Sequence, residues 1–309
     1  ETHSPRETVD TNFVKRFVSF VPEIKPQQIL SRRITLSSGL YLLPAGHRYS
    51  VELRESLVQL GHTVQDGSYL YYEGNLAGDI TPYEIFQGYC LALTFFHEAG
   101  RATCRAVKEL GGEVELHIDE FDKFRYGPKD EIVLRRNDIV RIAPLYRRVL
   151  PELATRDFNP LRNSLEFFTL FISEPHIKTR LLYLSICLES LLLEGNDNEG
   201  IAYKLGLRCA SFLHHCDRNI DLASTFSEVR NGYTLRSKII HGGDYDGESE
   251  NIIKKHRGKA TKELDHILIL EKIVKNVHYF ILSDQSFLEA ARQKTLGKKI
   301  DGELLLERS

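Results

Sequence analysis

The sequence predicts an α+β protein, with an N-terminal α+β domain over residues 1–135 and a helical bundle over residues 136–309. Two observations predict this order. Alternating and β-branched segments typical of strands occur before residue 125, whereas apolar residues at helical spacing dominate after Gly127 and Pro128. At 309 residues the chain is also long enough for two domains, with a hydrophobic content of 42% that is ordinary for a globular protein.

The N-terminal domain begins with a polar, proline-containing segment, residues 1–28, that we expect to be a loose lead-in with Phe13, Phe17 and Phe20 docked on the body. Thr81, Pro82 and Glu84 form a strong helix start, because they supply a cap, a proline at the first helical position and a capping box. The elements expected here are a hairpin over 29–43, a helix over 49–60, a strand over 68–73, a long helix over 82–110 ended by Gly111 and Gly112, and a strand over 113–118.

The C-terminal half shows helical periodicity almost throughout. We expect the tail from Ser286, which carries several lysines, to fray or to pack on a partner. The helices are expected over 137–154, 160–172, 176–195, 199–216, 220–241 and 262–283.

Composition limits the function classes. A net charge of −2 gives no global attraction to nucleic acid, so any RNA site must be a local patch. Five scattered cysteines indicate reduced thiols in a cytoplasmic protein rather than a disulfide framework. Neither a signal peptide nor an apolar run near the ~18 residues of a membrane span is apparent, so we expect no membrane association.

The sequence contains one group of possible metal ligands, but their spacing argues against a metal site. Cys209, His214, His215 and Cys216 are residue types that bind zinc, but no second pair follows at finger-like spacing. A thiol and imidazoles packed in a helical bundle are the favoured interpretation. We therefore expect neither a metal nor another cofactor.

One stretch carries candidate chemistry, the end of the helix expected over 220–241. It combines the permanent cation Arg236 with the titratable base His241, and Gly242 then stops the helix. A guanidinium can stabilise a phosphate under attack while an imidazole accepts the proton of a 2′-hydroxyl. With 12 histidines in the chain, an arginine followed five positions later by a histidine is expected about once by chance, so the context must carry the argument.

That context resembles the ApeA-like branch of the HEPN superfamily over about residues 176–283. Three segments carry the resemblance: an apolar helix over 180–193 with an embedded Leu-Glu-x-Leu at Glu189, a following helix over 201–213 with Arg208 at its middle, and the signature Tyr-x-x-Arg-Ser-x-x-x-His-Gly over 233–242. Active members often have Asn, Asp or His after the arginine. This chain has Ser237, which retains a hydroxyl for hydrogen bonding.

The resemblance implies an all-α bundle that pairs as a homodimer and acts as a metal-independent endoribonuclease leaving 2′,3′-cyclic phosphate ends, in prokaryotic antiviral defence or toxin systems. Arg236, Ser237 and His241 would be the catalytic residues. On a straight helix, positions five apart differ by about 140° in direction, so a second copy is expected to complete the site. The N-terminal domain would bind a regulatory ligand or protein.

Other residues are candidates for support. Glu189 is expected either to orient Arg236 or to pair with a buried Arg208. Two alternatives stay open: a non-catalytic HEPN module that binds RNA or a protein partner, and an unrelated helical protein in which His241 only caps a helix. The candidate RNA-binding residues are Tyr233, Lys238, Lys254, Lys255 and Arg257, with Tyr245 as a second candidate for stacking and Asp244 and Asp246 as opposing charges.

Overall fold

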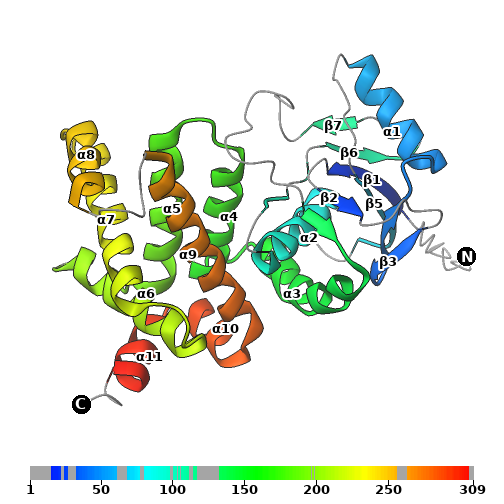
Figure 1. The fold of residues 1–309 in the computed structure, drawn as a ribbon. Helices are drawn as coiled ribbons and strands as arrows, with labels where there is room; N and C mark the ends of the chain where they lie inside the picture. The colour runs from blue at the N-terminus through cyan, green and yellow to red at the C-terminus, as the bar shows by residue number, and fades with distance from the viewer. Residues whose placement is uncertain are drawn as a thin grey trace, which may run out of the picture.

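The structure is a computed structural model that describes residues 15–21, 24–26, 33–60, 68–76, 80–97, 100–102, 104, 106–110, 114–116, 132–195, 197, 199–255 and 263–305. Figure 1 shows a sheet with its helices on one side of the molecule and a group of helices on the other. The predicted class, α+β followed by a helical bundle, is confirmed.

The sheet has six strands, all paired antiparallel, in the order β3-β4-β5-β1-β6-β7. A separate parallel pair is formed by β2 and β8. The strands are β1 (Lys15–Val21), β2 (Ile24–Pro26), β3 (Ile34–Ser37), β4 (Leu40–Leu43), β5 (Ser68–Gly74), β6 (Ala106–Glu109), β7 (Val114–Leu116) and β8 (Ile132–Leu134).

Strand β1 is central and buried on both faces, so the prediction that residues 1–28 are a loose lead-in is wrong for residues 15–21, and it is also wrong for residues 24–26, which form β2. Phe17 and Phe20 are buried in the body as expected, and Phe13 lies outside the described residues. Phe17 and Val21 join the cluster under α2 (Pro82–Phe96), whereas Val18 and Phe20 pack under α1 (Arg48–Gln59). A strand covered on both faces is a continuous apolar run without alternation.

The helix expected over 82–110 ends at Phe96, and the chain returns to enter the sheet as β6. The capping box at Thr81 is present as predicted. Side chains of α2 then bind the returning backbone: Thr94 Oγ1 accepts from Ala102 N at 2.8 Å, and Gln87 Oε1 accepts from Cys104 N at 2.9 Å. These side chains replace the backbone bonds that a longer helix would have made. The predicted stop at Gly111 and Gly112 lies outside the described residues.

The helical part follows from α3 (Arg136–Ala154). Over residues 286–305 the tail does not fray: α10 and α11 fold back on the bundle, and Phe287 packs edge-on against Phe212 with ring centroids 5.0 Å apart. A helix after His241, α8, was not predicted. The further helices are α4 (Pro160–Ser173), α5 (Ile177–Leu192), α6 (Ile201–Cys216), α7 (Leu222–Ile240), α8 (Tyr245–Lys255), α9 (Glu263–Ser283), α10 (Gln285–Arg292) and α11 (Leu296–Lys299), which continues into a π-helix at Ile300–Leu305.

The domain boundary predicted after residue 135 stays a prediction. It separates α3 from α2, and these two helices pack side by side next to the sheet (Figure 1). One continuous hydrophobic cluster also runs from β1 through α2 and α3 to α9.

Helix α9 joins the two parts through buried polar side chains. Arg101, in the chain returning from α2, donates from Nε to Glu271 Oε1 at 2.7 Å, and Lys275 Nζ donates to Gly100 O at 2.8 Å. One turn further, His278 stacks on Phe95 with ring centroids 4.7 Å apart, and its Nε2 lies 2.9 Å from Ser164 Oγ.

Acidification is expected to destabilise the protein through His278. Complete burial lowers the pKa of His278 to about 4, against an ordinary value near 6.5. The unfolded chain takes up a proton below pH 6.5 whereas the folded protein does not until about pH 4. Stability is therefore full above pH 6.5 and falls between pH 6.5 and 4, by about 2 kcal/mol at pH 5. Urea unfolding at pH 7 and pH 5 measures the loss, and His278→Gln should remove most of it. An equal loss in that variant would contradict the assignment.

Candidate functional site

Helix α7 (Leu222–Ile240) and the residues that cap its C-terminal end carry the predicted signature. It begins at the cap Asp221, whose Oδ1 accepts from Ser224 N, and it buries Val229 and Leu235 toward the bundle. Gly232 lies against α9, because a Cβ at this position would come within 3.0 Å of Leu270 Cδ2. The close crossing fixes the rotation of α7 about its axis.

The glycine stop predicted after His241 is confirmed. Gly242 has a φ of +66°, the left-handed conformation that glycine adopts without a steric cost. His241 N donates to Ser237 O at 3.0 Å, and Gly243 N donates to Lys238 O at 2.9 Å. The second bond spans five residues and, with the positive φ before it, defines a Schellman motif. His241 is thus the cap of a firmly ended helix, with its side chain exposed.

Arg236 points toward α5 and forms a two-point ion pair with Glu189. Arg236 Nε lies 3.1 Å from Glu189 Oε1, and Nη2 donates to Oε2 at 3.1 Å. The two side chains are 20% and 21% exposed, at the edge of the bundle. Burial raises the pKa of Glu189, and the Arg236 charge only partly opposes this. Of the two roles predicted for Glu189, orienting Arg236 is therefore the one that the structure shows.

Arg208 has other partners, so the alternative pairing with Glu189 is wrong. Its Nη2 lies 2.6 Å from Asp301 Oδ2, its Nη1 pairs with Asp197, and Nη1 also donates to Leu192 O at 2.8 Å. Burial disfavours the Asp197 carboxylate, but hydrogen bonds from Glu194 N, Lys204 and Arg208 together lower its pKa to about 2. Arg208 therefore ties the end of α5 to the C-terminal π-helix. Sequence reasoning missed both aspartates, which no spacing rule connects to Arg208.

Of the five candidate RNA-binding residues, the structure describes the side chains of three. Tyr233 is half-buried with one ring face under Arg236, whose guanidinium carbon is 5.4 Å from the ring centroid. Lys238 is half-buried, and Lys254 is exposed and paired with Glu250 at 3.3 Å. The side chain of Lys255 and the whole of Arg257 lie outside the described residues.

The segment after the motif is ordered by its acidic residues. Asp244 Oδ1 accepts from Gly247 N at 2.9 Å, which starts α8. Tyr245 is buried under the Lys178 ammonium, and Asp246 pairs with Lys178 at 3.2 Å. Of the two roles considered for Tyr245, packing is therefore the one found, and its buried ring offers no stacking surface. The aspartate three residues before a glycine–glutamate pair was the available signal for this helix.

Arg236 and His241 are not brought together within one chain. Arg236 is directed at Glu189, and no hydrogen bond joins it to His241, whose side chain has no hydrogen-bond or ionic partner in the described part of the chain. Ser237 lies between them and contributes its carbonyl to the helix end. The orientations agree with the large angular separation that helical geometry imposes.

The cysteine and histidine cluster of α6 is dispersed. Cys209 is completely buried, which raises the pKa of its thiol, and His214 Nδ1 lies 2.8 Å from Ile220 O. His215 is exposed beside Phe287. Across the residues that the structure describes, no three histidine, cysteine or acidic side chains are grouped closely enough to hold a metal ion.

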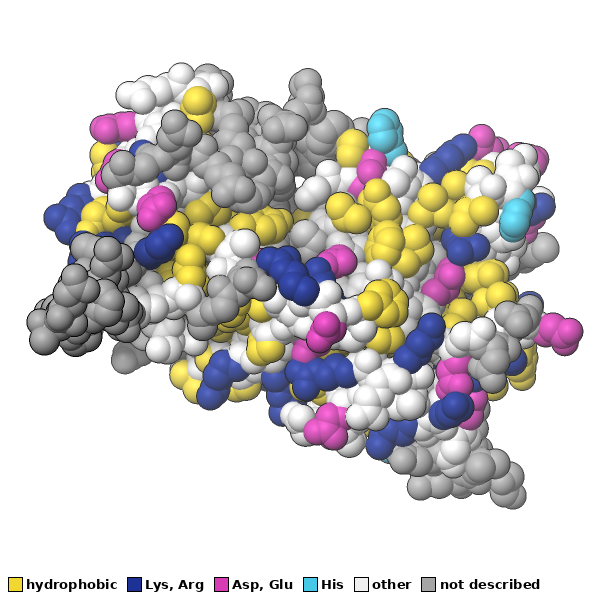
Figure 2. All heavy atoms as spheres, turned by 180° about the vertical axis from the view of Figure 1, so that it is seen from behind, with side chains coloured by type: hydrophobic (Ala, Val, Ile, Leu, Met, Phe, Trp, Pro, Cys, Tyr) yellow, Lys and Arg dark blue, Asp and Glu magenta, His cyan; other side chains and the backbone are white. Residues whose placement is uncertain are grey.

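Comparison of the chain with protein-family models, with curated proteins and with solved structures finds no match in any of the three. Within the described ranges, no helix combines the length and the hydropathy that a membrane crossing requires. The surface in Figure 2 has acidic and basic side chains interspersed over its described residues, in accord with the small net charge. The functional argument therefore depends on the local geometry of α7.

Removing the Arg208 side chain is expected to destabilise the helical part strongly. Arg208→Ala would remove the shorter of the two ion pairs of Asp197, whose side chain is only 7% exposed, and leave it with Lys204 at 2.9 Å, at a cost of about 2 kcal/mol. Chemical denaturation measures the free energy of unfolding. Arg230→Ala is the control, because Arg230 is exposed on α7, lies over the Phe226 ring and forms no ion pair with the residues that the structure describes. A loss no larger than that of the control would refute the structural role.

Proposed function

We propose that the protein is a metal-independent endoribonuclease of the HEPN type that acts as a homodimer. The observation that carries this proposal is the geometry of Arg236. Glu189 accepts one hydrogen bond from Nη2 and lies 3.1 Å from Nε, which leaves Nη1 and the second Nη2 hydrogen for another anion. A guanidinium held in this way at the edge of the bundle is preorganised to bind a phosphate at two points.

His241 supplies the other chemical group. As the exposed cap of α7, it can accept the proton of a ribose 2′-hydroxyl as a general base. The 2′-oxygen then attacks the adjacent phosphorus, the bond to the 5′-oxygen breaks, and that oxygen takes a proton from water, so that a 2′,3′-cyclic phosphate and a 5′-hydroxyl result. Arg236 stabilises the charge that develops on the phosphate oxygens. Ser237 is a candidate to hydrogen-bond the same phosphate.

The orientations within one chain support the proposed dimer. Because Arg236 is directed at Glu189 and positions five apart on a helix differ by about 140° in direction, we propose that each cleft combines Arg236 of one copy with His241 of the other. A two-fold axis near the end of α7 produces two such clefts at once. The exposed Ile240, with 49% of its surface accessible, lies beside His241 and would be covered by the partner.

Prokaryotic antiviral defence or a toxin system in the cytoplasm is the proposed setting, with RNA as substrate and the N-terminal part as the regulatory region. The second candidate is a non-catalytic module that binds RNA or a protein. The ion pair with Glu189 favours it to the extent that Arg236 already has a charged partner. Both candidates predict binding, and only the first predicts cleavage.

Replacing His241 is expected to abolish cleavage without unfolding the protein. His241→Ala should lower the rate on labelled single-stranded RNA in EDTA by at least about 100-fold, the usual contribution of a general base. His215→Ala, which removes an exposed histidine from α6, should keep the wild-type rate. Cleavage retained by His241→Ala would refute the site, and intact RNA with the wild-type protein would leave the non-catalytic module.

Mixing two inactive variants tests the shared cleft. If each cleft takes its two residues from different copies, Arg236→Ala and His241→Ala subunits should regain about a quarter of the wild-type activity after exchange, since half of the dimers are mixed and each has one complete cleft of two. The ends of the product should carry cyclic phosphate. Absence of recovery, with exchange verified by a size tag, would show that the residues act within one copy.

A further inference from the structure

A groove with a volume of about 270 Å³ lies where α3 meets the C-terminal end of α9 and the last residue of α2. Its lining residues come from both parts of the molecule, and none of them belongs to α7 or to the cap that follows it. Its lining combines two arginines, one tyrosine and one serine with apolar side chains. The lining residues are Phe96, Arg141, Pro144, Leu145, Arg148, Tyr279, Leu282 and Ser283.

The groove carries positive charge that no carboxylate of the described chain neutralises. Arg141 is exposed, and its one recorded contact is with the Phe96 ring, at 4.8 Å from guanidinium carbon to centroid. Arg148 uses Nη1 to donate to Leu282 O, which positions the guanidinium without satisfying its charge. Asp138, one turn before Arg141, accepts from Arg135 N at 3.0 Å and makes no ion pair with Arg141. An uncompensated pair of guanidinium groups favours an anionic ligand.

Two hydroxyl groups add hydrogen-bonding capacity. Tyr279 and Ser283 are four residues apart on α9, so they lie on the same face of this helix. Neither hydroxyl has a hydrogen-bond partner among the described residues. Pro144, Leu145 and Leu282 form apolar walls beside them. A few convergent polar groups in an otherwise apolar concavity are typical of small-molecule sites.

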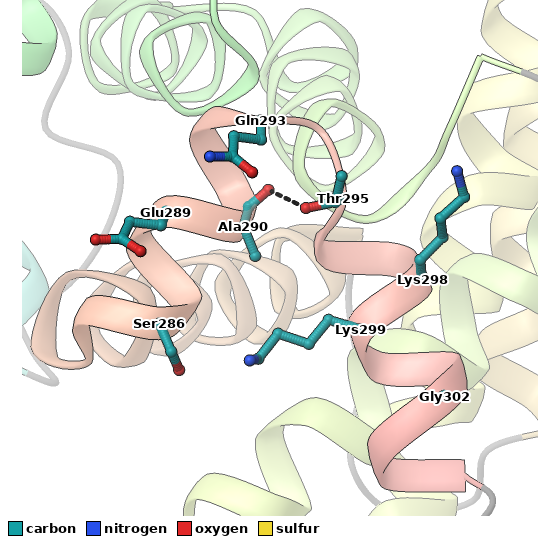
Figure 3. Close-up of a pocket in the computed structure, with 8 residues that line it drawn as sticks. All are labelled: Ser286, Glu289, Ala290, Gln293, Thr295, Lys298, Lys299 and Gly302. Carbon is teal, nitrogen blue, oxygen red and sulfur yellow. Dashed lines mark hydrogen bonds between the residues drawn. The ribbon is translucent and has the colours of Figure 1, made fainter.

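A second cavity provides a contrast. It has a volume of about 530 Å³ and lies between α10 and α11, where Glu289 and Gln293 accompany Lys298 and Lys299 (Figure 3). Lys298 Nζ is 3.3 Å from Glu194, so its charge already has a partner. The mixed charges of this open cavity favour neither an anionic nor a cationic ligand, whereas the groove between α3 and α9 favours an anion.

We propose that the groove between α3 and α9 binds an aromatic phosphate monoester no larger than a nucleoside monophosphate. The arginines and the two hydroxyls hold the phosphate through charge-assisted hydrogen bonds. The aromatic ring packs on Tyr279 and the apolar wall. A volume of about 270 Å³ lies just below the usual range for small-molecule sites, about 300–1,000 Å³, and therefore favours a small ligand.

Isothermal titration calorimetry of the full chain with AMP tests the proposal, with adenosine and inorganic phosphate as partial ligands. We expect AMP to bind at least tenfold more tightly than either part. Arg141→Gln should weaken AMP binding at least tenfold, and Tyr279→Phe severalfold, because each removes a hydrogen bond to the phosphate. Arg147→Gln is the matched control: Arg147 is exposed on the same helix and does not line the groove, so it should bind as the wild type does.

Three results would overturn the proposal: no binding of AMP at millimolar concentration, phosphate binding as tightly as AMP, or equal weakening by Arg147→Gln and Arg141→Gln. Thermal unfolding of each variant without ligand shows that a loss of binding is not a loss of fold. His241→Ala should bind AMP normally. The proposal for the groove can therefore be tested independently of the ribonuclease proposal.

Discussion

A stripe of buried polar side chains on α9 is the constraint on which the rest of the structure depends. Glu271, Lys275 and His278 recur at positions i, i+4 and i+7, so they share one face of the helix. Their exposed fractions are 6%, 3% and 0%. Charged and polar groups tolerate such burial only when they are paired, and each of the three finds a partner outside α9.

The partners of this stripe come from the chain that returns from α2 and from α4. A shift of α9 by one turn would separate Glu271 from Arg101 and leave both charges unpaired in the interior, at a cost of several kcal/mol. The docking of the helical part on the sheet part is therefore specified by charge as well as by apolar contact. The position of α7 depends on this docking in turn, because Gly232 seats α7 directly on α9.

Elements defined by neighbouring residues could be predicted from the sequence, whereas those that depend on residues far along the chain could not. The start of α2 could be predicted from Thr81 and Glu84, since a capping box is made by neighbours in sequence. Its end could not, because Gln87 and Thr94 bind a backbone that returns from outside the helix. The central strand β1 was missed for a related reason: its two buried faces erase the alternation by which strands are recognised.

The candidate site shows the same division. The end of α7 was predictable, since Gly242 needs only its own left-handed conformation to stop the helix. The sequence left two possible partners for Glu189, Arg236 and Arg208. The packing of α5 against α7 places Arg236 beside Glu189. Asp197 and Asp301 were invisible because they meet Arg208 across 11 and 93 residues.

The distance along the chain between α9 and its partners has a consequence for how the protein is made. Arg101 and Glu271 are 170 residues apart, and Gly100 and Lys275 are 175 apart. A ribosome adding about 5–20 residues per second completes the sheet long before it releases α9. For many seconds the nascent N-terminal part therefore lacks α9, so that Arg101 and Gly100 do not yet have Glu271 and Lys275 beside them. Contacts of such long range also slow folding, so a chaperone that shields this face would act during that interval.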